Sequence, residues 1–117
     1  MTKHRSQLYE GMYILSATLS EESRKKALNK ITQSIEEKKG QIHKIHDHDR
    51  QRLAYSINGK REGYYYLIYF TIVTSAINEL WQEYHLNEDL IRFMTLTAEK
   101  VVEEKVEFNI FNQGARK

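Results

Sequence analysis

Residues 64–72 read YYYLIYFTI, and this stretch decides the fold class. Its aromatic and β-branched side chains predict a strand. Side chains of a strand alternate between the two faces of a sheet, so one face receives Tyr66, Ile68, Phe70 and Ile72. The other face receives Tyr65, Leu67, Tyr69 and Thr71. Both faces of this predicted strand are therefore largely apolar.

The residues before this strand predict a hairpin. Asn58-Gly59 is a turn signal because both residues tolerate positive φ. The turn is expected to extend through residues 60–62 to Gly63. Residues 41–57 predict the preceding strand. It is more hydrophilic than residues 64–72, because histidine and aspartate side chains stand among its apolar positions.

The first helix is predicted closer to the N-terminus, after a strand at residues 8–15. Its apolar positions recur at helical spacing: Leu28, Ile31 and Ile35. Thr18 with Glu21 has the spacing of a capping box, while Ser20 is a competing N-cap. Gly40 is expected to end the helix in the left-handed conformation.

A second helix and a last strand follow residues 64–72. Thr74 or Ser75 is expected to cap this helix. Its apolar face is predicted to consist of Ile77, Leu80, Trp81 and Tyr84. Residues 90–96 predict the last strand.

The order β-α-β-β-α-β predicts an α+β, ferredoxin-like split fold. Such a fold has a four-stranded antiparallel sheet with both helices on one face, and the first and third strands are expected at its centre. The predicted domain covers residues 8–97. Residues 1–7 form a short basic N-terminal arm, and residues 98–117 form a polar C-terminal tail that is expected to fray.

The two apolar faces of the central strands predict a partner. Two helices cover only one face of a sheet. If the other face meets water, polar residues should alternate with apolar ones along each central strand. A contiguous apolar patch marks an interaction site, although exposed tyrosines are also common on strands. The sequence lacks the glycine-and-aromatic signature of the common RNA-recognition motif, which binds RNA on such a sheet, so we expect a protein on this face. The expected partner residues are Met12, Ile14, Tyr65, Leu67 and Tyr69.

Composition limits the function. The chain has 117 residues, a formal net charge of +2 and no cysteine, which excludes disulfides and cysteine-based sites. We expect a cytoplasmic protein with no membrane span and no signal peptide. Because bulk charge is small, any contact with nucleic acid must come from local basic groups.

Basic side chains cluster where loops or strand ends are predicted. Each one taken alone is most simply a solvated surface charge, whereas together they form a candidate RNA-binding set, since Arg and Lys bind phosphate oxygens. The candidates are Lys3, Arg5, Arg50, Arg52, Lys60, Arg61 and Arg92.

Short pieces of the sequence resemble one known family, that of the sixth protein of the bacterial small ribosomal subunit. They are Tyr9-Glu10, Arg52-Leu53-Ala54-Tyr55 with Ile57, Lys60-Arg61-Glu62-Gly63-Tyr64-Tyr65, and Arg92-Phe93-Met94. They occur in the family's order over about residues 8–97. Two positions depart from the family pattern, since Gln51 replaces a frequent arginine and Ser56 replaces the usual proline.

The resemblance implies a non-catalytic protein that binds 16S ribosomal RNA of the central domain. It also implies a heterodimer with the eighteenth protein of the small subunit. Carried onto this chain, Arg52, Lys60, Arg61 and Arg92 become candidates for contact with RNA or the partner. No cofactor and no small-molecule substrate are expected.

Two other functions are less well supported by the sequence. His46 and His48 point to the same face of a strand and could hold a metal with a third ligand, or they could simply make an edge strand hydrophilic. A regulatory module that homodimerises through its sheet and binds a small ligand is the alternative function. Residues 16–19 lack the glycine-rich loop that such a module favours.

Overall fold

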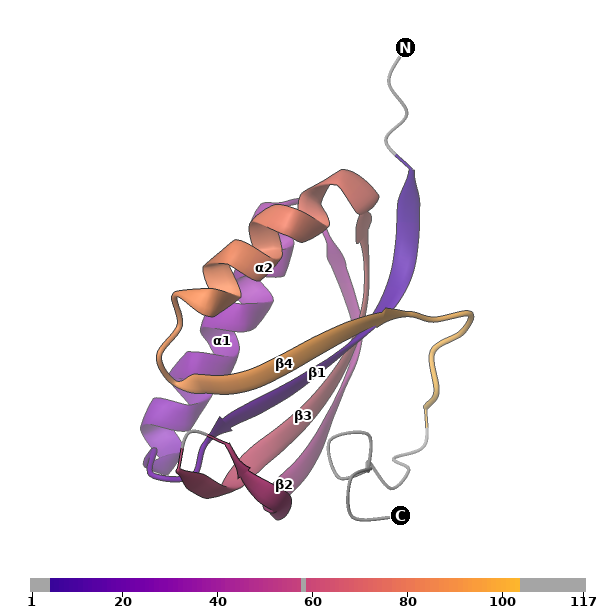
Figure 1. Ribbon diagram of the computed structural model, residues 1–117. Coiled ribbons are helices and arrows are strands. Elements are labelled where there is room, and N and C mark those ends of the chain that lie inside the picture. The colour runs from indigo at the N-terminus through magenta and orange to yellow at the C-terminus, as the bar shows by residue number, and fades with distance from the viewer. Residues whose placement is uncertain (1–4, 58, 104–117) are drawn as a thin grey trace.

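The computed structural model describes residues 5–57 and 59–103 (Figure 1). Its elements are β1 (Ser6–Ser16), α1 (Glu21–Glu37), β2 (Gln41–Ile57), β3 (Lys60–Val73), a 3-10 turn (Thr74–Ala76), α2 (Ile77–His85) and β4 (Leu90–Thr97). They form one sheet with the strand order β2-β3-β1-β4. All its strand pairs are antiparallel. The predicted β-α-β-β-α-β fold is confirmed, with the first and third strands at the centre.

Both helices lie on the same face of the sheet (Figure 1). Their apolar residues meet those of β1 and β3 in one core, which includes Ile31, Ile35, Leu80, Phe70 and Ile72. We call the sheet surface beneath α1 and α2 the helix-side face. No helix of the described part of the chain is long and apolar enough to span a membrane.

A pair of tyrosines joins the sheet to α2 within this core. The hydroxyls of Tyr13 and Tyr84 are hydrogen-bonded at 2.7 Å, and their rings meet edge to face with centroids 5.2 Å apart. Burial raises the pKa of Tyr13, and the bond from Tyr84 only partly opposes it. Burial likewise raises the pKa of Tyr84, and the neighbouring Tyr13 adds to the effect. Both hydroxyls are thus held neutral in the folded chain.

The ends of α1 differ from two expectations. Ser20, the competing cap, is the N-cap and accepts a hydrogen bond from the Ser23 amide at 3.1 Å. At the other end Lys39, not Gly40, takes the left-handed conformation, with φ of 65°. Gly40 is needed for space instead, because a Cβ there would come within 2.6 Å of the Ile35 side chain.

The hairpin and the start of α2 also correct the sequence-based expectations. β3 begins at Lys60, so residues 60–63 belong to the strand and not to an extended turn. Gly59 takes a φ of 79°, as its place in a tight turn requires, whereas Asn58 lies outside the described residues. No side chain caps α2, because a 3-10 turn leads directly into it. Trp81, predicted on the apolar face of α2, is 37% exposed.

Candidate nucleic-acid and partner interface

A β-bulge positions the basic residues of β2. Asp47 is opposite Tyr66 and Arg50 is opposite Tyr64, so between these two pairs β2 has one residue more than β3. Asp49 accommodates the extra residue by taking a φ of 62°, and the Asp49 amide donates a hydrogen bond to the Asp47 side chain at 2.8 Å. Aspartate tolerates this conformation better than most residues. The bulge therefore fixes where Arg50 leaves the sheet.

The hairpin end of the sheet gathers three of the predicted cations in described positions. Arg50 forms an ion pair with Glu62, and this bond raises the pKa of Arg50. Arg52 is also opposite Glu62 in the register, and both Arg52 and Arg61 are exposed. Glu62 and the bulge residues Asp47 and Asp49 thus stand beside three guanidinium groups, so a net positive charge at this end needs a further cation. We call this region the hairpin end.

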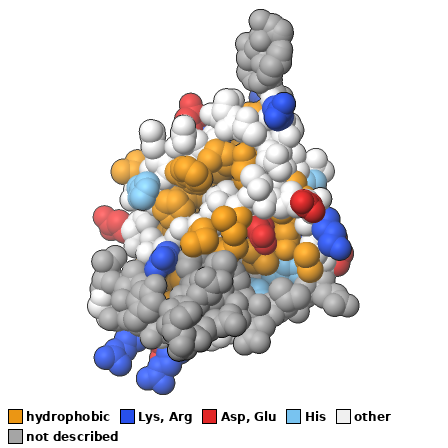
Figure 2. Space-filling view, turned by 45° about the vertical axis from the view of Figure 1, so that its right-hand side comes forward, with side chains coloured by type: hydrophobic (Ala, Val, Ile, Leu, Met, Phe, Trp, Pro, Cys, Tyr) orange, Lys and Arg blue, Asp and Glu red, His pale blue; other side chains and the backbone are white. Residues whose placement is uncertain are grey.

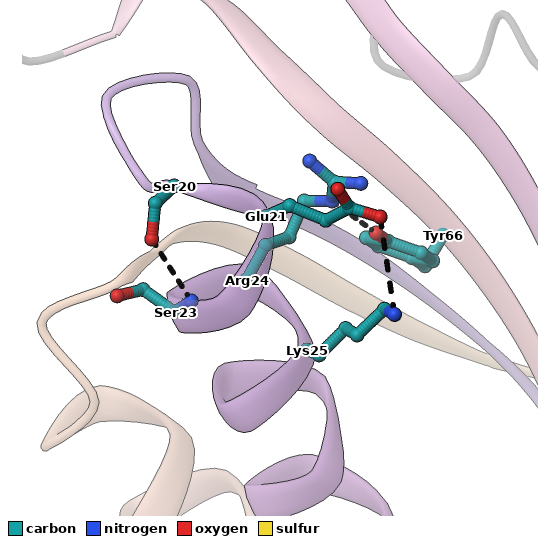
Figure 3. A network of polar contacts seen from close by, with 6 residues as sticks. All are labelled: Ser20, Glu21, Ser23, Arg24, Lys25 and Tyr66. Atoms are coloured by element: carbon teal, nitrogen blue, oxygen red, sulfur yellow. Dashed lines mark hydrogen bonds and ion pairs between the residues drawn. The ribbon is translucent and has the colours of Figure 1, made fainter.

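Arg24 is a further cation at the hairpin end that the sequence did not reveal. Its guanidinium carbon lies 4.0 Å from the centre of the Tyr64 ring, and its Nε donates to the Tyr66 hydroxyl at 2.9 Å. Figure 3 shows Arg24 reaching from the first turns of α1 to Tyr66, beside the Ser20 cap. Cation–π contact and the hydrogen bond fix this side chain against β3. Helical spacing predicted only the apolar face of α1, so nothing marked Arg24.

The remaining basic candidates fall in different places. Arg92 is opposite Ile14 near the hairpin end, but on the β4 edge and on the face away from the helices. Arg5 is exposed just before β1, an 11-residue strand, and so lies at the other end of the sheet. At about 3.3 Å per residue, that is roughly 33 Å from the hairpin end. Lys3 lies outside the described residues, and Lys60 is placed only by its backbone, opposite Ile57.

The sheet surface opposite the helices is buried, which corrects the expectation of an open patch. We call it the far sheet face. All five residues expected to meet a partner, namely Met12, Ile14, Tyr65, Leu67 and Tyr69, are between 0% and 4% exposed. Together with Leu53 they form a second apolar cluster, separate from the helix-side core. Figure 2 shows the apolar side chains that remain visible on the molecule from this side, with Lys and Arg mostly toward the margins.

The chain itself supplies part of what covers this face. Ala98, Val101 and Val102 pack on the second cluster, together with Ile91 and Met94 of β4. We call residues 98–103 the C-terminal cover. These residues were expected to fray into solvent, but after the last strand the chain turns back over apolar side chains that would otherwise meet water. The rest of the predicted tail lies outside the described residues.

Two of the three histidines of β2, His46 and His48, lie at the edge of the far sheet face. His46 and His48 are both buried, with ring centroids 6.5 Å apart. The Nε2 atom of His46 is 2.7 Å from the carbonyl oxygen of Val102, so His46 fastens the C-terminal cover. Among the described residues no group of three or more His, Cys, Asp or Glu side chains is placed to hold a metal ion. Within that part of the chain, the geometry favours a structural role for His46.

Comparison with known proteins decides the family. The family model for ribosomal protein S6 matches residues 8–97. The chain belongs to the ribosomal protein S6 family. Small ribosomal subunit protein bS6 of Chlamydia pneumoniae is 61% identical over 103 residues, which cover 88% of this chain and 92% of that protein. The bS6 protein of Protochlamydia amoebophila is 56% identical over 113 residues, covering 97% and 98%.

One solved structure supports the same family, and a second shares only the fold. The crystal structure of 30S ribosomal protein S6 from Thermotoga maritima superposes with a TM-score of 0.76 at 30% identity, covering 80% of this chain and 89% of that one. The C-terminal domain of MgtC from Mycobacterium tuberculosis has a TM-score of 0.56 at 12% identity, a likeness of fold alone. As a member of the S6 family, the chain is a structural protein of the small ribosomal subunit in the cytoplasm and is not an enzyme. Membership thus favours the ribosomal interpretation over a ligand-binding regulatory module.

Proposed function

We propose that this chain binds 16S ribosomal RNA through the hairpin end and does so cooperatively with the eighteenth protein of the small subunit, during assembly of the central domain. Membership of the S6 family is the observation that carries the proposal. The hairpin end supports it with the cations Arg24, Arg50, Arg52 and Arg61. Lys60, Arg92, Arg5 and Lys3 remain further candidates for RNA contact.

The charge of the chain explains why a partner is needed. The formal net charge is only +2, so long-range attraction to RNA is weak. Each neutralised phosphate adds affinity mainly by releasing counterions, and a handful of such contacts gives modest binding. Joining two weakly binding proteins raises the effective concentration of each at the RNA. The pair therefore holds RNA that neither protein holds well alone.

Filter binding to a central-domain fragment of 16S RNA tests this proposal. The affinity of the chain is measured with and without the eighteenth protein, over a range of salt concentrations. We expect the partner to raise the affinity at least about tenfold, as linked binding predicts. Equal affinity in both series would contradict cooperative binding.

Single-residue variants test the placement of the RNA contact. Arg61→Ala is expected to weaken RNA binding and to reduce the slope of log affinity against log salt by about 0.7–0.9, the loss of one phosphate contact. Lys30→Ala is the matched control, because Lys30 is an exposed cation on α1. An equal loss in the two variants would show that the RNA does not choose the hairpin end.

A further inference from the structure

The C-terminal cover is a short segment with few apolar side chains, although the side chains that it covers are large. Beneath it lie large side chains such as Tyr65, Leu67 and Tyr69, which are at most 4% exposed. The cover has no helix or strand and contributes three small apolar side chains, Ala98, Val101 and Val102, all of them half-buried. Its packing is therefore limited compared with that of the two helices on the other face.

Few polar contacts among the described residues fasten the cover. The Ala98 amide donates to the Leu8 carbonyl at 2.9 Å, and His46 is bonded to the Val102 carbonyl. A hydrogen bond between the Val102 backbone and the Tyr69 hydroxyl lowers the pKa of Tyr69. Burial of Tyr69 has the larger effect and raises this pKa above its ordinary value. Lys44 and Glu103 form an ion pair of 3.7 Å with side chains 40% and 74% exposed. Exposed pairs of this kind add little stability.

The folded domain is complete before the cover begins. All helices and strands of the described chain lie between Ser6 and Thr97. The ribosomal protein S6 family model likewise ends at residue 97. Removing the cover from the sheet would therefore break no strand pairing and no contact between the sheet and the helices, while it would uncover the second apolar cluster.

We propose that residues 98–103 occupy the far sheet face only in the free chain and that the partner protein displaces them to take the same face. This inference rests on the proposed function, which supplies the partner. The displacing surface must be an apolar protein surface, because the face is built of Met12, Ile14 and Leu67 with Tyr65 and Tyr69. RNA is disfavoured around Tyr69, because the Glu10 carboxylate stands 3.5 Å from the Tyr69 hydroxyl and repels phosphate, whereas Arg92 lies farther along the face, opposite Ile14.

Such a cover lowers partner affinity in a predictable way. The apparent dissociation constant equals the intrinsic value divided by the fraction of chains whose face is open. A variant with a weakened cover has a larger open fraction, so it binds the partner more tightly although it gains no contact. The free chain in turn avoids presenting an apolar patch that would promote association with other proteins.

The test uses the full chain with Val101→Ser and Val102→Ser combined. Both substitutions remove apolar area from the cover and leave the far sheet face and the net charge unchanged. The matched control is Leu86→Ser with Ile45→Ser, two apolar residues that are 81% and 39% exposed and lie outside the cover. Affinity for the purified eighteenth protein is measured by calorimetry, and hydrophobic dye binding is measured without the partner.

We expect the cover variant to bind the partner about 5–10-fold more tightly than the native chain, with the control unchanged. Dye binding should rise in the cover variant alone, while its urea midpoint stays close to the native value. Unchanged or weaker partner affinity would overturn the inference. If neither the native chain nor either variant binds the eighteenth protein, the proposed function fails. The dye experiment then still decides whether the cover opens, because unchanged dye binding in the cover variant would overturn the inference.

Discussion

Tyr65 and Tyr66 are neighbours in β3, and both are buried, but different parts of the chain bury them. Tyr66 belongs to the core that α1 and α2 complete, whereas Tyr65 belongs to the cluster on which the C-terminal cover packs through Ala98, Val101 and Val102. Two helices are built into the fold order, while the cover is an irregular segment after the last strand. The comparison teaches that equal burial does not imply equal permanence, because stability differs between regions of one structure.

The largest effect is expected on the helix-side face. Leu80 of α2 is fully buried in that core. Leu80→Ala should lower the free energy of unfolding by about 4 kcal/mol, since the helix is held in place and the cavity cannot close. Urea denaturation followed by circular dichroism measures this value. A cost below about 2 kcal/mol would show that α2 is as easily displaced as the cover.

The matched leucine on the far sheet face should cost less. Leu67→Ala removes the same atoms from a residue that is 4% exposed. We expect a loss of about 2 kcal/mol, because the irregular cover can settle into the space. The same urea experiment applies. Equal losses for Leu67→Ala and Leu80→Ala would break the comparison between the faces.

The buried tyrosine pair gives a third prediction. Tyr84→Phe removes one hydroxyl of the 2.7 Å bond and leaves the buried Tyr13 hydroxyl without that partner. The expected cost is about 1–2 kcal/mol. The double variant with Tyr13→Phe should cost less than the sum of the single variants, because no orphaned group remains. Additive costs from the same denaturation curves would argue against a direct bond.

The same pair makes the helix-side face sensitive to alkali. Both tyrosines have folded-state pKa values raised above the ordinary value of 10 by burial. Above about pH 10 the unfolded chain loses these protons and the folded chain keeps them, so the free energy of unfolding falls as pH rises. Stability should be unaffected by this pair below about pH 9. Unfolding curves from pH 8 to 11 measure the fall, which Tyr84→Phe should reduce.

The smallest effect compares one ion pair from each face. Lys38 and Glu83 join α1 to α2, and the bond from Lys38 lowers the pKa of Glu83. This contribution is present above the ordinary pKa of Glu and is lost as pH falls through the lowered value. Because Glu83 is 44% exposed, Glu83→Gln should cost no more than about 0.5–1 kcal/mol. Glu103→Gln, in the more exposed pair of the cover, should cost less, and the opposite ranking would contradict the account.

Much of the fold followed from local pattern. Apolar spacing predicted both helices, and alternation in residues 64–72 correctly assigned side chains to two faces. The cation cluster was only partly predictable, because Arg24 is recognised by its contact with Tyr64 and not by its neighbours in sequence. Lys39 in the left-handed conformation and the bulge at Asp49 were missed, since neither residue type demands a positive φ.

The cover was not predictable from the sequence. Residues 98–103 read AEKVVE, which is too polar and too short to indicate a buried segment. Its place depends on a contact between His46 and Val102, far apart in the chain. The argument for an open partner surface was therefore wrong for the chain alone, although the apolar character of that face was correctly predicted. Family membership does not depend on it.

Thiol labelling at two adjacent positions tests the difference between the faces most directly. The native chain has no cysteine, so Leu67→Cys and Ile68→Cys each introduce a single thiol, one on each face of β3. We expect Cys at position 67 to react at least about tenfold faster, through local opening of the cover, while position 68 reacts only on global unfolding. Equal rates, each matching the global unfolding equilibrium, would contradict a displaceable cover.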